Sequence, residues 1–188
     1  MRRATSSVKL SWDDYVRLPE DGLRHELLDG AHLVTPTPVR RHQAIVLNIA
    51  ASIRWHLKWH PSGSVYVAPF DVVLSEHDVV QPDVLYISRE RARVVEQQPW
   101  VKGAPSLVVE VMSPGTRQRD EGVKRRLYER AGVDEYWLVD PESDGITVLR
   151  RNGERFEVVS TLRRDTGEVL TTPLLPGWTM TLADVFEE

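Results

Sequence analysis

The chain has 188 residues, a formal net charge of −4 and an apolar content of 41%, which suits the core of one globular domain. It contains no cysteine, which excludes disulfides, thiolate metal sites and a cysteine nucleophile, so oxygen or imidazole nitrogen must hold any metal. The N-terminal residues lack the apolar stretch of a secretory signal, and no apolar run is long enough for a membrane span. We therefore expect a soluble, intracellular protein without a transmembrane helix.

The first half of the chain predicts helices, a hairpin and several strands. Ser11 caps a short helix that has acids in its first turn and should end near Pro19. The turn residues Asp29 and Gly30 predict a hairpin between strands at 24–28 and 32–35. The remaining elements of this half are a long helix over 42–59, strands at 64–67, 70–74 and 84–87, and a short helix over about 88–95.

The second half predicts a strand–helix–strand unit. Residues 106–111 form a continuous apolar run, which is typical of a central strand buried on both faces. Residues 116–131 predict a helix that Gly132 closes, and residues 136–139 predict a second buried strand. The helical connection makes these two strands parallel, so we expect an α/β fold with helices on both faces of a mixed sheet. The last elements are a strand pair at 146–149 and 155–159 and a short helix at 182–186.

Two carboxylates stand at strand positions where acids are unusual. Asp83 directly precedes the apolar strand at 84–87, and Glu110 lies near the end of the most apolar strand. A buried acid is costly unless it is paired, protonated or bound to a cation. Two such carboxylates at neighbouring strand ends would form a hard oxygen site suited to Mg²⁺ or Mn²⁺. The alternative is that Asp83 caps a turn and Glu110 forms a buried ion pair with an arginine.

A basic helix follows the Glu110 strand after a Ser-Pro-Gly turn. Lys124 lies fourteen residues beyond Glu110, within the first turns of this helix. The flexible side chain of Lys124 could place its ammonium over the end of the Glu110 strand, or Lys124 could be a solvated lysine on the helix surface. Residues 30–70 contain no Asp or Glu, which leaves room for a basic face, although scattered charges explain this stretch equally well.

Together these segments resemble the Uma-type restriction endonuclease family of the PD-(D/E)XK nuclease superfamily. The resemblance covers roughly residues 10–150, with every segment in the expected order. It implies a restriction-endonuclease-like mixed β-sheet core flanked by helices, over about 20–142 of a single 1–188 domain. An extra N-terminal hairpin and a C-terminal β extension over about 143–188 complete this expectation. The strings that carry the resemblance are Glu-Leu-Leu-Asp-Gly at 26–30, Gln-Pro-Asp at 81–83, Val-Glu-Val-Met-Ser-Pro at 109–114, and the stretches 124–133 and 135–141.

The resemblance also implies roles for the central residues. Asp83 is the aspartate of the motif and Glu110 is its second acid, and we expect both to bind Mg²⁺ (or Mn²⁺) with the carbonyl of Val111. Met112 occupies the usual position of the motif lysine, so Lys124 on the following helix is expected to replace it. Lys124 would then orient the attacking water or stabilise charge on the phosphorane.

Further residues match the family or carry suitable charge. Glu26 matches an additional family acid that would hold a second ion or a water, or it is an exposed strand carboxylate. His42 contacts phosphate or is a polar cap at the start of its helix. Arg117, Arg119 and Arg125 are candidate contacts to backbone phosphates, which supply affinity rather than sequence selection.

These expectations describe a Mg²⁺-dependent endonuclease that hydrolyses phosphodiester bonds of nucleic acid, with DNA as the expected substrate. The alternative is a non-catalytic module that keeps the fold and binds nucleic acid or protein, which the net acidity and the displaced lysine slightly favour. A hydrolase built on histidines is a weaker alternative, because the residues between His56 and His60 lack the glutamate of the zinc protease motif.

The cysteine-free composition fits a cytoplasmic protein. The resemblance also suggests a homodimer, since two equivalent sites across a two-fold axis can cut both strands of a duplex. The candidate contact residues for such a dimer are the aromatic side chains of Trp55, Trp59 and Trp178, which could equally belong to the core.

Overall fold

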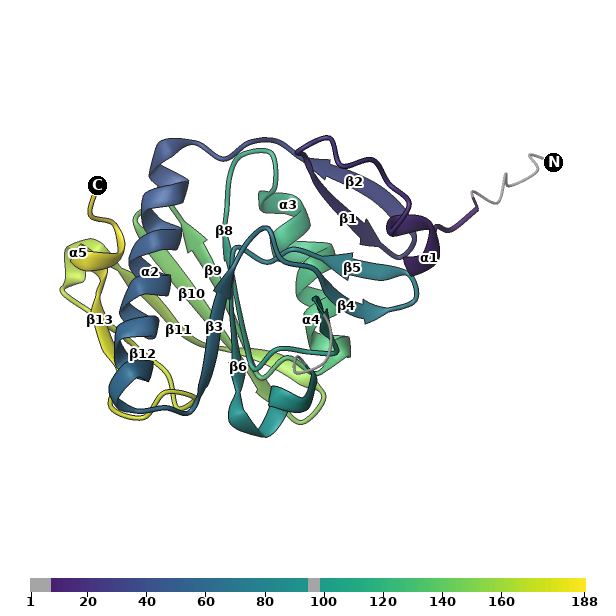
Figure 1. The fold of residues 1–188 in the computed structure, drawn as a ribbon. Coiled ribbons are helices and arrows are strands. Elements are labelled where there is room, and N and C mark those ends of the chain that lie inside the picture. Colours follow the sequence, from purple (N-terminus) through teal and green to yellow (C-terminus); the bar gives the residue numbers. More distant parts are fainter. Residues whose placement is uncertain (1–7, 95–98) are drawn as a thin grey trace.

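The computed structural model describes residues 8–94 and 99–188, and its largest layer is a mixed six-stranded sheet (Figure 1). The strand order across this sheet is β11-β10-β9-β8-β6-β3. β8 and β9 run parallel, as the strand–helix–strand prediction requires, and the other neighbouring pairs are antiparallel. The strand bounds are β3 (Gly63–Val67), β6 (Val84–Ser88), β8 (Leu107–Val111), β9 (Glu135–Asp140), β10 (Gly145–Asn152) and β11 (Arg155–Arg163).

A five-stranded sheet of order β2-β1-β5-β4-β7 contains the predicted hairpin. Both turn residues of this hairpin have positive φ, 51° at Asp29 and 75° at Gly30, which is the backbone geometry that suits a tight two-residue hairpin turn. A separate two-stranded sheet is formed near the C-terminus. The bounds are β1 (Arg24–Leu28), β2 (Ala31–Thr35), β4 (Val72–Ser75), β5 (Asp78–Val80) and β7 (Val101–Lys102) in the five-stranded sheet, and β12 (Val169–Thr171) and β13 (Thr179–Thr181) in the small one.

Helices cover both faces of the six-stranded sheet, as predicted. The long helix α2 lies along one face, and the α3–η2–α4 segment lies on the other (Figure 1). None of the helices in the described ranges has the length and apolarity needed to span a bilayer. The helix bounds are α1 (Trp12–Tyr15), α2 (Arg40–Trp59), η1 (Arg89–Val94), α3 (Arg117–Arg119), η2 (Asp120–Lys124), α4 (Arg125–Ala131), η3 (Arg164–Thr166) and α5 (Leu182–Val185), where η1 and η3 are 3₁₀-helices and η2 is a π-turn.

The alternation of side chains along the central strands builds two separate cores. Val109 points into the core under α2, where it joins Ile49. Val108 points to the opposite face and joins Leu127 of α4. Because side chains alternate along a strand, Glu110 lies on the same face as Val108, under the α3–η2–α4 segment.

The predicted fold class is confirmed, and the differences concern element boundaries and the short strands β5, β7, β12 and β13, which were not predicted. The regular part of α1 ends at Tyr15, and only three-residue turns continue it to Leu18. The helix predicted over 116–131 contains the π-turn η2, although Gly132 closes it in left-handed geometry as expected. The helix predicted over about 88–95 is η1, and its predicted last residue lies outside the described residues.

Trp178 is buried, which corrects its inclusion among the candidate exposed aromatics. Its side chain is 4% exposed and stacks on Trp137, with 5.8 Å between the ring centroids. Its indole Nε1 donates a hydrogen bond to Oγ of Ser52 on α2, at 3.0 Å. The chain around β12 and β13 therefore packs against both the central sheet and α2.

Replacing this tryptophan tests whether the C-terminal extension folds with the core, since the single domain over 1–188 remains a prediction. We expect Trp178→Ala to cost about 3–5 kcal/mol of unfolding free energy, as for other large-to-small core changes. Urea unfolding followed by far-UV circular dichroism and by tryptophan fluorescence should give one coincident transition in both proteins. Val158→Ala, on an exposed position of β11, is the control. Two separate transitions in the wild type would contradict the single domain.

Candidate functional site

Asp83 and Glu110 meet at one point of the central sheet. Val84 of β6 pairs with Val109 of β8 in antiparallel register, so the next position brings Asp83 opposite Glu110. Side chains directly opposed in an antiparallel pair have Cβ atoms about 4.5–5.5 Å apart. Both carboxylates are buried, and both line one cavity of about 460 Å³. The structure thus brings together the two acids that the sequence analysis takes from separate strands.

Asp83 is held by three donors. Nη1 of Arg24 lies 2.9 Å from Oδ1, Nε2 of His42 lies 3.1 Å from Oδ2, and the backbone N–H of Val111 donates to Oδ2 at 2.9 Å. Burial raises the pKa of Asp83, but the hydrogen bond from His42, the charge of Arg24 and the N–H of Val111 together bring the pKa below its ordinary value. Asp83 is therefore an ionised carboxylate in a buried position.

Lys124 is the centre of a second buried cluster. Its Nζ lies 2.9 Å from Oε1 of Glu110 and 2.8 Å from Oε1 of Glu26. Tyr128 also donates to Oε1 of Glu110, at 2.7 Å, and the backbone N–H of Gln81 donates to Oε1 of Glu26 at 2.9 Å. With its side chain 3% exposed, Lys124 is not a solvated helix lysine. Glu26 is not an exposed strand carboxylate, because its side chain is buried against Lys124.

The protonation of this cluster follows from its charge count. Burial raises the pKa of Glu110 to about 8, against the lowering effect of Lys124, and the charges of Asp120 and Asp83 add to the rise. Burial lowers the pKa of Lys124, but Glu110 and Glu26 reverse this and raise the pKa above its ordinary value. We therefore assign a positive charge to Lys124 and a proton to Glu110, because the buried acids of the cluster outnumber the cations beside them.

The π-turn η2 carries both Asp120 and Lys124 into the site. Wider turns of this kind occur mostly as single interruptions of an α-helix, frequently at functional sites. Asp120 is buried and lines the same cavity, although it was not among the predicted site residues. The sequence signal for Asp120 is its spacing of four residues from Lys124, because residues four apart lie on the same face of an α-helix. Arg24 was also missed, although it shares a strand face with Glu26 two positions later.

The predicted phosphate contacts divide into two groups. His42 and Arg119 line the cavity, together with Pro36 and Pro38 of the chain between β2 and α2. Arg117 and Arg125 do not line it.

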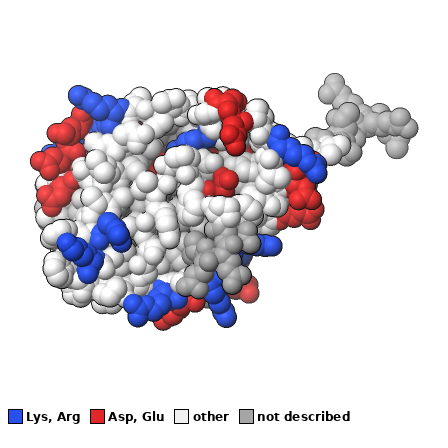
Figure 2. Space-filling view, viewed as in Figure 1, with Lys and Arg blue, Asp and Glu red and all other residues white. Residues whose placement is uncertain are grey.

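Acidic partners engage one predicted phosphate contact and a basic residue of the acid-free stretch 30–70. Arg117 forms ion pairs with Asp140 at 2.7 Å and with Glu142 at 3.2 Å. Arg40 is paired with Glu188 at 3.0 Å. On the face of the described residues seen in Figure 2, Lys and Arg side chains are spread over the surface and alternate with Asp and Glu side chains.

The site offers oxygen atoms of the kind that bind divalent cations, although both carboxylate oxygens of Asp83 accept hydrogen bonds from the protein. The backbone N–H of Met112 donates to the carbonyl of Val139 on β9. Successive residues of a strand direct their backbone N–H and carbonyl groups to opposite sides, so those of Val111 point away from β9 and towards Asp83. The described residues contain no cluster of three His, Cys, Asp or Glu side chains that could hold a metal ion, so a backbone carbonyl would have to supply the third oxygen. Lys124 and Tyr128 both bind Oε1 of Glu110, which leaves Oε2 available. Carboxylate and carbonyl oxygens are the donors that Mg²⁺ and Mn²⁺ prefer.

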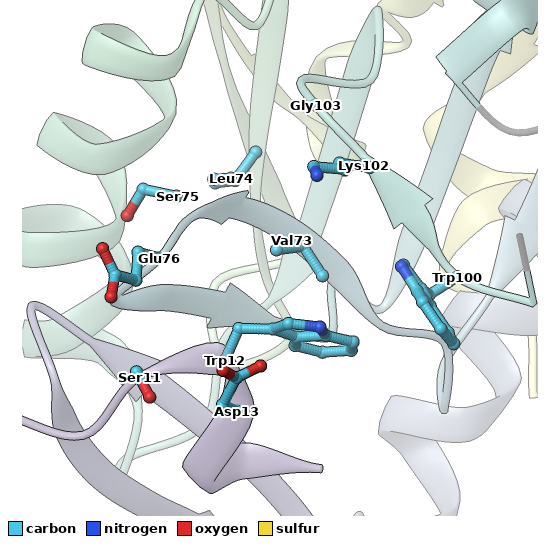
Figure 3. Close-up of a pocket in the computed structure, with 10 residues that line it drawn as sticks. All are labelled: Ser11, Trp12, Asp13, Val73, Leu74, Ser75, Glu76, Trp100, Lys102 and Gly103. Atoms are coloured by element: carbon cyan, nitrogen blue, oxygen red, sulfur yellow. The ribbon is translucent and has the colours of Figure 1, made fainter.

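A larger hollow of about 550 Å³ lies elsewhere, against the five-stranded sheet. Figure 3 shows Trp12 and Trp100 on one side of it, and Lys102 across from them. It contains none of the residues predicted for the site. The smaller cavity is therefore the candidate site, because it combines ionised groups from several segments.

Comparisons with known proteins agree with this architecture. The model of the Uma2 family, described as "Putative restriction endonuclease", matches residues 12–183. The fold is similar to the crystal structure of "a putative nuclease belonging to DUF820 from Anabaena variabilis ATCC 29413", with a TM-score of 0.79 and 19% identity. This similarity covers 94% of this chain and 97% of that chain. No curated protein matches the sequence.

The proton held by Glu110 predicts a pH-dependent stability. In metal-free buffer the unfolded chain ionises this group near its ordinary pKa of 4.5, whereas the folded protein keeps the proton up to about pH 8. The stability contributed by the group is complete below pH 4.5 and is lost as pH rises through 8. Glu110→Gln keeps a side-chain oxygen that accepts from Lys124, but it cannot ionise and so does not lose stability as pH rises. We expect its stability relative to wild type to increase by at least about 1 kcal/mol from pH 5 to pH 8.

Urea unfolding of both proteins at the two pH values measures this difference. Glu154→Gln, which changes an exposed acid, is the matched control and should show no such trend. A difference that stays constant between pH 5 and pH 8 would show that Glu110 holds no extra proton.

Proposed function

Because the chain belongs to the Uma2 family, we propose that it is a metal-dependent endonuclease that hydrolyses phosphodiester bonds of nucleic acid, with DNA as the expected substrate. One observation carries the proposal. Asp83, Glu110 and Lys124 come from three separate segments and line a single cavity. Ionisable side chains are costly to bury, and a site that retains three of them in one cavity is typical of a catalytic centre.

In the proposed site Asp83, Glu110 and the carbonyl of Val111 hold Mg²⁺ or Mn²⁺. The bound ion supplies charge neutralisation at the phosphate and a lower pKa for bound water. Lys124 faces the same cavity with its ammonium fixed between Glu110 and Glu26, so its positive charge is preorganised for the phosphorane. The contact at 2.8 Å favours a role for Glu26 in positioning Lys124, in place of the ion-binding role that the resemblance implies.

His42 and Arg119 line the cavity and are the proposed contacts to substrate phosphates. Arg117 already has acidic partners, and Arg125 lies outside the cavity lining, so neither gains support as a phosphate contact at this site.

A binding module without cleavage is the second candidate. The guanidinium of Arg24 occupies Oδ1 of Asp83 at 2.9 Å, where a cation would need access. A scaffold that never binds metal would keep this ion pair, whereas a nuclease must open it. Titration with Mn²⁺ separates the two candidates, because only the nuclease should bind the ion at Asp83.

Conservative substitutions test the nuclease directly. We expect Asp83→Asn, Glu110→Gln and Lys124→Met each to reduce Mg²⁺-dependent cleavage of plasmid and of labelled oligonucleotides by roughly a hundredfold or more. Lys102→Met, on an exposed lysine of β7 outside the cavity, is the matched control and should keep full activity. Circular dichroism of each variant checks the fold. Full cleavage by folded Asp83→Asn would remove Asp83 from the mechanism.

We also propose that the protein acts in the cytoplasm as a homodimer formed through α2. Trp55 and Trp59 are 65% and 63% exposed, and with Leu47 and Ala51 they form an exposed stripe at four-residue spacing. Antiparallel pairing of two α2 helices about a two-fold axis would oppose the small Ala51 to Trp55 of the second copy. It would also bring Lys58, in the last turn of α2, near the N-terminal end of the second copy's α2, where Glu188 pairs with Arg40 and Arg41.

Size-exclusion chromatography with light scattering tests the dimer. The wild type should have twice the mass of the chain, and the double variant Trp55→Ala/Trp59→Ala should be a monomer, because truncating central aromatics removes most of such an interface. Val158→Ala changes an exposed apolar residue on β11 and should leave the dimer intact. A monomeric wild type at the highest soluble concentration would contradict the proposal.

A further inference from the structure

A second cavity, of about 200 Å³, adjoins the candidate site. The two cavities share a wall that consists of Arg24, His42, Asp83 and residues 35–38. Ala68 lines only the second cavity, and its backbone N–H donates to the carbonyl of Asp83 at 3.2 Å. The second cavity is therefore attached to the segment that carries Asp83, and a molecule bound at Asp83 can extend into it.

The shared wall contains buried polar atoms that lack a hydrogen-bond partner among the described residues. They are Nε of Arg24, Oγ1 of Thr35 and Nδ1 of His42. Arg24 and His42 are each held by Asp83, through Nη1 at 2.9 Å and Nε2 at 3.1 Å, so their remaining nitrogen atoms have fixed positions. Buried polar atoms almost always have a partner. These atoms therefore indicate a ligand with polar groups between the two cavities.

The rest of the second cavity has the chemistry that suits a nucleobase. Leu23, Val46 and Ala68 contribute apolar surface, and the exposed Gln43 in the first turn of α2 contributes an amide. A base has apolar faces and hydrogen-bonding edges, so it can use both kinds of group. Among the described residues, Asp83 is the only acid that lines this cavity, so little negative charge opposes an adjoining phosphate.

The size of the second cavity decides which form of nucleic acid can enter. Its volume of about 200 Å³ lies below the roughly 300–1,000 Å³ of sites for drug-sized molecules. A single base matches such a volume, whereas a base pair within a duplex does not. Enzymes that hold a base in a pocket either act on single strands or take the base out of the stack.

We propose that the second cavity binds the unpaired base of the nucleotide next to the phosphate at Asp83. The substrate class is then single-stranded nucleic acid, or a junction that contains an unpaired nucleotide. Arg24, Thr35 and His42 bind the sugar and phosphate groups between the two cavities. The inference rests on the proposed function, because it takes the cavity of Asp83 as the place where the phosphate binds.

The experiment measures binding without metal, so that no cleavage occurs. Labelled single-stranded DNA and the matching duplex are titrated with the protein in EDTA at near-physiological salt, which weakens non-specific phosphate contacts, and fluorescence anisotropy is recorded. We expect the wild type to bind the single strand roughly tenfold or more tightly than the duplex, because a duplex must first be unpaired. Ala68→Phe fills the second cavity and should remove this preference. Ala31→Phe adds the same ring at an exposed position of β2 and should keep it.

A second variant removes an unpartnered atom without changing the shape of the wall. Thr35→Val should weaken binding of the single strand by roughly threefold or more, while its melting temperature equals or exceeds that of the wild type. A purely structural Thr35 would give a lower melting temperature and unchanged affinity. This variant also carries the test if circular dichroism shows that Ala68→Phe does not fold.

The outcomes separate this inference from the proposed function. If the wild type binds duplex as tightly as single strand, or if folded Ala68→Phe and Thr35→Val bind both as the wild type does, the inference is overturned. The nuclease proposal still stands in that case, provided that Mg²⁺-dependent cleavage requires Asp83. If the wild type neither binds nor cleaves nucleic acid, both are overturned.

Discussion

The ion cluster around Lys124 determines how the helical layer sits on the sheet. Glu26 and Glu110 come from different sheets, and each lacks access to water. One ammonium lies within hydrogen-bonding distance of both. Removing one partner of a buried pair leaves an uncompensated charge, which typically costs about 3–5 kcal/mol. The ion cluster thus connects the two sheets to the π-turn, in addition to the apolar packing between them.

Under the proposed function, the buried acids of this site would bind a cation at the expense of the stability of the metal-free protein. Apolar residues in place of Asp83 and Asp120 would avoid the cost of desolvating two acids. Proteins keep such unfavourable groups mainly where a ligand uses them, and the cost is offset elsewhere in the fold. Here the offset comes from the two apolar cores on either side of the central strands.

The sequence predicts those features that depend on local patterns. Asp29 and Gly30 specify the hairpin by their turn chemistry, and the apolar run before Glu110 specifies a central strand. The strands β5 and β7 escape prediction because two or three residues carry no measurable periodicity. The burial of Asp120 also escapes prediction, since a change from α- to π-geometry has no residue signature, and an acid on a basic helix resembles a solvated one. Trp178 is misplaced because only tertiary packing decides which aromatic residues are covered.

The chain between β2 and α2 contributes Pro36 and Pro38 to the cavity wall. The pyrrolidine ring fixes φ at each proline, so this part of the wall has little conformational freedom to lose when a ligand arrives. A ligand that enters the cavity therefore contacts a wall whose backbone conformation is already restricted. If the ligand is the proposed nucleic acid, a poorly fitting phosphate backbone would have to change its own conformation, so this wall would select substrates by shape.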